Sequence, residues 1–339
     1  MPNVRLGKTE IIVNKNGFGA LPIQRVEKTE AVRLLHKAYD GGINFYDTAR
    51  MYTDSEEKLG EAFSDRRNHV FISSKTGATT VEQFWKELET TLRNLKTDHL
   101  DIYQFHNPSF CPKPGDESGI YDAALEAKQK GMILHIGITN HRLHVAQEAI
   151  KSNLYETLQF PFCYLSGDEE LKLLKGCEQQ DMGFLSMKAL SGGLITNAAA
   201  AYAFQAQYST LPLWGIQRES ELNEFLSFID NPPTMDEEIS ALIAKDRQEL
   251  LGDFCRGCGY CMPCPAGIEI NNCARMSLLL RRSVASNYLS PQWQEKMKKV
   301  EDCRNCNACK KKCPYGLDTP ALLKKNYEDY KEILAGKAF

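Results

Sequence analysis

Cysteines crowd into one short stretch of this 339-residue chain, and their spacing restricts what that stretch can fold into. Nine of the 12 cysteines lie between Cys255 and Cys313, whereas only Cys111, Cys163 and Cys177 precede them. Such a density indicates either disulfides or bound metal. Short Cys-x2-Cys steps that end in Cys-Pro favour metal, so the cysteines also mark the start of a separate domain.

The second of two cysteine runs has the ligand spacing of bacterial ferredoxins. Cys303, Cys306, Cys309 and Cys313 are separated by two, two and three residues, and Pro314 follows the last of them. In this arrangement three closely spaced thiolates bind one 4Fe-4S cluster, and the fourth reaches a second cluster. The run therefore predicts iron-sulfur ligation.

The first run has the same form but is one residue shorter before its last cysteine. It contains Cys255, Cys258, Cys261 and Cys264, followed by Pro265. Eight thiolates match two 4Fe-4S clusters with four ligands each. The expected sets are Cys255, Cys258 and Cys261 with Cys313, and Cys303, Cys306 and Cys309 with Cys264. The shorter spacer leaves this exchange of Cys264 and Cys313 open.

Zinc is the competing metal for these cysteines. Paired Cys-x2-Cys ligands suit zinc, but two runs of four closely spaced cysteines, each ending in Cys-Pro, suit it poorly. Cys273 is surplus to two clusters and is expected in the core of the following helix. The connection between the runs has a helical pattern, which resembles helical ferredoxins more than the compact type that contains β-strands.

Before the cysteines, short β-branched or aromatic runs alternate with segments of helical period, which is typical of repeated βα units. Eight parallel strands in about 230 residues are best closed as a (β/α)8 barrel, with an open doubly wound sheet as the alternative. The fold class is thus α/β, a TIM barrel followed by a mainly α-helical ferredoxin-like dicluster domain. We expect a barrel over residues 1–229, a linker or bridging helix over 230–253 and the cluster domain over 254–339. The expected strands are 17–21, 44–48, 70–75, 100–106, 134–139, 157–162, 183–189 and 210–215.

Polar side chains stand at the ends of three consecutive predicted strands, where the catalytic groups of such barrels lie. Asp47 and Tyr52 follow the second strand, Lys75 ends the third and His106 ends the fourth. Reduction of a carbonyl needs a hydride on carbon and a proton on the developing alkoxide. Four such groups in this order favour a catalytic site over ordinary polar strand ends.

These four residues resemble the catalytic tetrad of the aldo/keto reductase family. Asp47 and Tyr52 stand in the D-T-A-x-x-Y setting, and Lys75 and His106 match in order and strand position. The resemblance implies an oxidoreductase acting on aldehyde, ketone or alcohol groups of a small substrate, with Tyr52 as proton donor. A nearby Lys75 cation would lower the pKa of the Tyr52 phenol. Asp47 would hold Lys75 charged, and His106 would orient the carbonyl oxygen.

The same resemblance implies a nicotinamide cofactor, NADP(H) or NAD(H), at the barrel mouth. Thr139, Asn140 and Gln159 match the positions that hold the carboxamide. The loops expected to bind the phosphates contribute Leu190, Gly192, Gly193, Gly215 and Arg218. Arg218 is the one plausible clamp for a 2'-phosphate, so the choice between the two cofactors stays open, as does loss of nicotinamide binding. Gly17-x-Gly19 lacks the third glycine of a dinucleotide fingerprint.

The charge balance gives no bulk attraction to nucleic acid or to an anionic membrane. The chain has 41 basic and 44 acidic residues, a net charge of -3. No stretch approaches eighteen uncharged apolar residues, which predicts a cytoplasmic protein outside the membrane. Lysines near the second cysteine run form either a solvated face or a docking patch for an acidic carrier such as a ferredoxin or flavodoxin. They are Lys296, Lys298, Lys299, Lys310, Lys311 and Lys312.

The two predicted chemistries do not combine directly. A hydride carries two electrons, whereas a 4Fe-4S cluster passes one, so coupling normally needs a flavin or another converter. Four arrangements follow: a nicotinamide-dependent reductase with structural or regulatory clusters, a reductase driven by an electron carrier, a flavin-containing barrel, or an electron-transfer subunit whose barrel is only a scaffold. Retention of the tetrad argues against the last.

Overall fold

The computed structural model of the protein describes residues 3–250, 254–282 and 285–337. The chain divides into two compact units, one formed by Met1–Ala189 with Ala198–Ser240 and the other by Leu190–Asn197 with Ala241–Phe339. Helix α9 (Glu237–Glu249) begins in the first unit and ends in the second. We therefore keep 230–253 as the proposed bridging segment, although residues 251–253 lie outside the described part.

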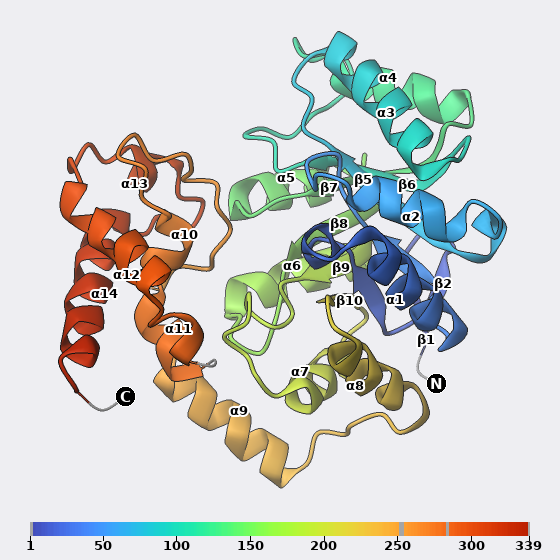
Figure 1. Ribbon diagram of the computed structural model, residues 1–339. Coiled ribbons are helices and arrows are strands. Elements are labelled where there is room, and N and C mark those ends of the chain that lie inside the picture. The colour runs from blue at the N-terminus through green and yellow to red at the C-terminus, as the bar shows by residue number, and fades with distance from the viewer. Residues whose placement is uncertain (1–2, 251–253, 283–284, 338–339) are drawn as a thin grey trace. The chain divides into compact units, whose positions relative to one another are not determined.

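The first unit is a closed barrel of eight parallel strands (Figure 1). Each strand pairs with the next along the chain, and the last returns to the first through Trp214 opposite Phe18. This closure confirms the barrel and rules out the open doubly wound sheet. In order round the barrel the strands are β3 (Gly17–Gly19), β4 (Phe45–Asp47), β5 (Phe71–Thr76), β6 (Leu100–His106), β7 (Ile133–Thr139), β8 (Thr157–Pro161), β9 (Gly183–Met187) and β10 (Leu211–Gly215).

A helix follows each barrel strand, and the sequence pattern shows why these segments are helical. In α3 (Val81–Leu95) the buried residues recur every three or four positions, so one face packs on the sheet. The Thr80 side chain accepts from the Gln83 N–H at its start, and Lys96 ends it in a left-handed conformation. The other helices are α1 (Lys28–Asp40), α2 (Ser55–Phe63), α4 (Ile120–Gln129), α5 (Leu143–Ser152), α6 (Asp168–Gln179), α7 (Ala198–Ala206) and α8 (Glu219–Asp230).

An N-terminal hairpin, which the sequence patterns did not predict, precedes the barrel. Strands β1 (Asn3–Arg5) and β2 (Ile12–Asn14) pair antiparallel, and their apolar side chains pack with Phe45, Ile102 and Leu211 in one core cluster. Gly7 between them has a φ of +54°, and a Cβ there would lie 2.2 Å from the Asp181 carbonyl oxygen. The hairpin thus covers the barrel at the end where its strands begin.

The second unit is helical in its described part. It contains α10 (Ile270–Cys273), α11 (Met276–Arg282), α12 (Pro291–Lys298), α13 (Ala308–Lys312) and α14 (Thr319–Leu334). Ile268, Met276, Met297 and Tyr330 lie in its apolar core together with several cysteines. This confirms the predicted helical region after the barrel. None of the helices in the described ranges is long and apolar enough to cross a membrane.

Candidate active site and cluster-binding site

The four residues of the predicted tetrad lie together at one end of the barrel. Asp47 ends β4, Lys75 stands one residue before the end of β5, His106 ends β6, and these three strands are neighbours. Lys75 Nζ lies 2.6 Å from Asp47 Oδ2 and 5.3 Å from the centre of the Tyr52 ring. The Tyr52 and His106 rings meet edge to face, with centroids 5.9 Å apart. Parallel neighbouring strands therefore bring together groups 59 positions apart in sequence, from 47 to 106.

Lys75 is a buried cation with two oxygen acceptors. Its Nζ donates to Asp47 Oδ2 and to the Thr48 carbonyl oxygen, both at 2.6 Å. Burial lowers the pKa of Lys75, while the Asp47 carboxylate opposes this by its charge and its hydrogen bond. Asp47 is thus the group that keeps a charged ammonium in this position.

His106 is a neutral imidazole at physiological pH. Removal from water lowers the pKa of His106 to about 3, and the nearby Lys75 charge acts in the same direction. A neutral imidazole has one ring nitrogen that donates and one that accepts. His106 can therefore donate a hydrogen bond to a carbonyl oxygen without adding a second cation to the site.

Gln104, which sequence reasoning did not single out, supports this site from β6. Its buried Nε2 donates to Ser73 Oγ and Gln159 Oε1, each at 2.8 Å, and lies 3.4 Å from Asp47 Oδ1. Alternation along a strand puts residues 104 and 106 on one face. The sequence carried one signal of this supporting role, because Gln104 is an amide side chain two positions before His106 in a buried strand.

A second unpredicted network anchors the loop that carries Tyr52. Glu56 is fully buried, accepts from Ser74 Oγ at 2.9 Å and Thr91 Oγ1 at 2.8 Å, and forms an ion pair with Arg50. Arg50 precedes Tyr52 by two residues in the loop after β4. The ion pair therefore ties the loop to the first turn of α2, and the hydrogen bond from Thr91 connects Glu56 to α3.

Of the predicted carboxamide-binding residues, Thr139 ends β7, Asn140 follows it, and Gln159 is the middle residue of β8. Asn140 donates to the Pro108 carbonyl oxygen at 2.8 Å, and its Oδ1 accepts from the backbone of His141 and Arg142. Gln159 Nε2 lies 3.3 Å from Asp47 Oδ2. Each amide nitrogen carries two hydrogens, so each has the capacity to donate to a ligand as well. The donor set fits a carboxamide, which offers a donor and an acceptor.

The predicted phosphate-binding residues divide between the two units. Gly215 ends β10, and exposed Arg218 precedes α8 with its Nε 3.7 Å from Glu221 Oε1, both in the barrel unit. Leu190, Gly192 and Gly193 belong to the second unit. Gly192 and Gly193 both have positive φ, of 65° and 92°. The Gly193 N–H donates to the Leu190 carbonyl oxygen at 2.9 Å, so this N–H stabilises the turn.

One histidine and three cysteines of the barrel unit are also buried. Burial lowers the pKa of His141 well below its ordinary value, and the charge of Lys188 adds to this. Cys111 Sγ lies 3.8 Å from Tyr155 Oη, and burial raises the pKa of this thiol to about 11. Cys163 and Cys177 are buried as well. These cysteines are therefore packed as small apolar side chains.

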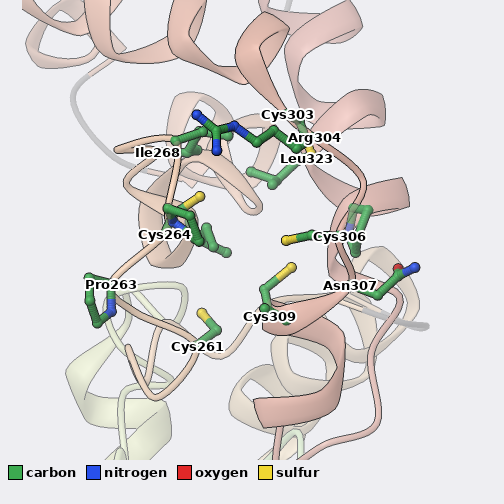
Figure 2. Close-up of a pocket in the computed structure, with 15 residues that line it drawn as sticks. Cys261, Pro263, Cys264, Ile268, Cys303, Arg304, Cys306, Asn307, Cys309 and Leu323 are labelled. Carbon is green, nitrogen blue, oxygen red and sulfur yellow. The ribbon is translucent and has the colours of Figure 1, made fainter.

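The cysteines of the two runs surround two cavities of the second unit. Figure 2 shows one cavity, in which the sulfur atoms of Cys264, Cys306 and Cys309 turn toward a common space. Its sulfur-bearing lining residues are Cys261, Cys264, Cys303, Cys306 and Cys309. The other cavity is lined by Cys255, Cys258, Cys261 and Cys313. Cys264 and Cys313 thus each line the cavity of the opposite run, and the thiol donor sets fit two 4Fe-4S clusters.

Cys273 stands apart from both cavity linings. It is fully buried in α10, and its Sγ lies 3.9 Å from the Lys296 carbonyl oxygen. Burial raises the pKa of Cys273 to about 12. This thiol is a packed core side chain, which agrees with its being surplus to the eight ligands.

Two sequence families match the chain. The aldo/keto reductase family matches residues 15–200, and the 4Fe-4S dicluster domain matches residues 254–318. Among curated relatives, the uncharacterized oxidoreductase YqkF of Bacillus subtilis is 29% identical over 208 residues, which span 57% of this chain and 66% of that protein. L-galactose dehydrogenase of Arabidopsis thaliana is 28% identical over 210 residues, 56% of this chain and 66% of that protein. The chain thus spans just under two thirds of the length of these relatives.

Solved structures resemble the barrel. An aldo-keto reductase from Bacillus halodurans in its holo form has a TM-score of 0.64 and 19% identity, covering 73% of this chain and 96% of its own. One from Klebsiella pneumoniae in complex with NADPH has a TM-score of 0.60 and 22% identity, covering 72% of this chain and 94% of its own. At these identities the likeness establishes the shared fold.

Proposed function

Because the chain belongs to the aldo/keto reductase family and carries a 4Fe-4S dicluster domain, we propose that its barrel interconverts a small carbonyl compound and its alcohol. The observation that carries this proposal is the buried Lys75–Asp47 pair beside the Tyr52 ring. An ion pair that only stabilises the fold does not require a phenol beside it, whereas an ion pair that lowers the pKa of a phenol does.

The roles of the tetrad follow from its electrostatics. Tyr52 gives its proton to the oxygen that becomes the alcohol, and the Lys75 charge stabilises the phenolate that remains. Asp47 keeps Lys75 charged and in place through the 2.6 Å contact. His106, neutral because its pKa is about 3, donates to the same substrate oxygen and orients it.

A nicotinamide cofactor bound at this end of the barrel would supply the hydride. We propose that Thr139, Asn140 and Gln159 hold its carboxamide through their hydroxyl and amide groups. The phosphates would be held by Leu190, Gly192, Gly193, Gly215 and Arg218. The exposed Arg218 guanidinium favours NADP(H) over NAD(H), in line with the bound NADPH of the Klebsiella relative.

The cysteine cavities support two 4Fe-4S clusters, which carry single electrons when bound. We propose Cys255, Cys258, Cys261 and Cys313 as ligands of the first cluster. The second would be held by Cys264, Cys303, Cys306 and Cys309. Zinc is the less suitable occupant, because two runs of four closely spaced cysteines, each ending in Cys-Pro, have the ligand spacing of iron-sulfur proteins and not that of paired tetrahedral sites.

The decisive experiment is Tyr52→Phe in protein purified without oxygen. We expect the rate of NADPH-dependent carbonyl reduction to fall by about 10²–10⁴-fold, the usual contribution of a general acid. Iron content and the thermal unfolding midpoint should stay at wild-type values. Tyr39→Phe, on the α1 helix, is the matched control and should keep full activity. Turnover retained in Tyr52→Phe would refute the assignment.

A protein electron carrier is favoured by the surface around the second run. Cys306 is exposed, as are Lys311 and Lys312 at the end of α13. We propose that an acidic ferredoxin or flavodoxin docks on this basic surface. Electron transfer to such a carrier should slow with added salt and with Lys311→Glu, whereas salt-insensitive transfer would contradict docking of this kind.

A flavin in the barrel is the remaining candidate for joining two-electron and one-electron chemistry. The optical spectrum of anaerobic protein, followed by titration with NADPH, separates the arrangements. Bleaching of cluster absorbance by NADPH would indicate coupling between nicotinamide and clusters. A flavin band would identify the converter, and clusters that stay oxidised would favour a structural or regulatory role.

A further inference from the structure

The segment Leu190–Asn197 belongs to the same compact unit as the cysteine runs, although it follows barrel strand β9 in sequence. Two arginines of that unit hold its backbone. Arg275 Nη1 donates to the Gly192 carbonyl oxygen at 2.9 Å, and Arg282 Nη1 donates to that of Leu194 at 3.3 Å. The segment is therefore attached to the cluster unit through backbone carbonyls.

Arg275 also lies against the loop of the first cysteine run. A Cβ placed on Gly257 would lie 2.7 Å from Arg275 Cζ, and one placed on Gly192 would lie 3.0 Å from Arg275 Nη1. Both glycines have φ near +65°. The guanidinium thus packs closely against two backbone segments, and the missing side chain of Gly257 in particular leaves room for it.

The charge of Arg275 has no carboxylate within ion-pair distance among the residues that the structure describes. Its Nε is buried and has no hydrogen-bond partner in that part of the chain. Gly257, against which the guanidinium packs, stands between Cys255 and Cys258 in the sequence, so two proposed ligands of the first cluster flank the position that Arg275 contacts. Arg275 is half-buried, and a cation partly removed from water is stabilised by nearby negative charge, which these ligands supply as thiolates.

We propose that Arg275 is a positioning residue that raises the reduction potential of the cluster held by Cys255, Cys258, Cys261 and Cys313, and that it fastens segment 190–197 to that cluster's loop. The inference rests on the proposed cluster ligation. The proposal also implies regulation of segment 190–197. This segment is expected to contact the cofactor phosphates, and Arg275 contacts both it and the loop of the first cluster. The state of that cluster would thereby affect the segment.

The direction of the effect follows from charge. Reduction adds one electron to a cluster whose four thiolates already make it anionic, so a fixed cation stabilises the reduced form more than the oxidised form. Loss of the Arg275 charge should lower the potential of this cluster. The other cavity includes neither Cys255 nor Cys258 in its lining, so its cluster should change less.

The test uses the full chain, purified anaerobically, with dithionite as reductant and electron paramagnetic resonance as the readout. Arg275→Gln keeps an amide donor but loses the charge, and we expect one of two midpoint potentials to fall. Arg275→Lys should retain most of the wild-type value. Arg281→Gln, on helix α11 that begins directly after Arg275, is the matched control because Arg281 is paired with Asp329, and it should change neither potential. Unchanged potentials in Arg275→Gln would overturn the proposal.

Hydrogen exchange over residues 190–197 gives a second readout. We expect faster exchange in Arg275→Gln and wild-type exchange in Arg281→Gln. If Arg275→Gln fails to retain iron, Gly257→Ala decides instead, because its Cβ would lie 2.7 Å from Arg275 Cζ and the guanidinium would have to shift; unchanged exchange and potentials there overturn the inference. Wild-type protein without two clusters would refute the proposed ligation itself, which separates the two failures.

Discussion

Replacing Asp47 by Asn removes the counter-charge of a cation that has no access to water. Lys75 is 1% exposed and Asp47 3% exposed, with 2.6 Å between their charged atoms. Leaving one member of a buried pair unpaired costs about 3–5 kcal/mol. A barrel of this size loses about 2–4 °C of its unfolding midpoint per kcal/mol, so we expect a fall on the order of 10 °C.

The double variant Asp47→Asn with Lys75→Met separates the cost of an unpaired charge from other effects of losing Asp47. Because this variant leaves no buried charge of the Lys75–Asp47 pair unpaired, it should lose less stability than Asp47→Asn alone.

The stability of Asp47→Asn should also depend on pH in a definite direction. Without Asp47 the pKa of Lys75 falls further, so the unfolded chain binds more protons below about pH 10 and the free energy of unfolding rises with pH.

Urea and thermal unfolding followed by the fluorescence of Trp214 measure these effects, because this buried tryptophan lies in barrel strand β10. A Trp293→Phe background removes the tryptophan of α12 from the signal. Asp47→Asn within about 1 kcal/mol of wild type would refute the argument, given the range for broken buried pairs. So would a double variant whose loss equals the sum of the single losses.

Two further predictions concern His106 and the cysteines. The folded pKa of His106, about 3, lies below its unfolded value near 6.5, so the unfolded chain binds more protons between these limits and stability rises with pH there. His106→Gln should remove a slope of up to about 1.4 kcal/mol per pH unit from urea unfolding between pH 4 and 6; an unchanged slope would contradict the neutral imidazole. Cys264→Ala should lose one of two cluster signals and Cys273→Ala none, measured by iron content and electron paramagnetic resonance, and equal losses would show the ligand assignment to be wrong.

The barrel was predictable because its elements carry strong periodic signals. The strand expected at 100–106 is β6 with the same bounds. The N-terminal hairpin was not predictable in this way. Strands of three residues are too short to show alternation, and β1 and β2 are stabilised by apolar contacts with barrel residues far along the chain.

The site was predictable to the level of strand ends. Asp47, Lys75 and His106 could be placed together because parallel neighbouring strands end at the same edge. The hydrogen bonds of Gln104 and Glu56 depend instead on register and on the seating of α3, which local sequence does not encode. Such supporting residues emerge only from tertiary contacts.

The cluster unit includes a part of the chain that precedes the bridging segment 230–253. The density of cysteines predicted a domain boundary after the barrel, but it gives no sign that residues 190–197, which contain no cysteine, belong to the cluster unit. The structure groups these residues with the cluster unit, where Arg275 and Arg282 donate to their carbonyl oxygens. A loop that begins at the end of a barrel strand is thus held by residues that follow the barrel. A barrel without the cluster unit would retain its strands but lose the donors to Gly192 and Leu194, so the order of this loop depends on the cluster unit.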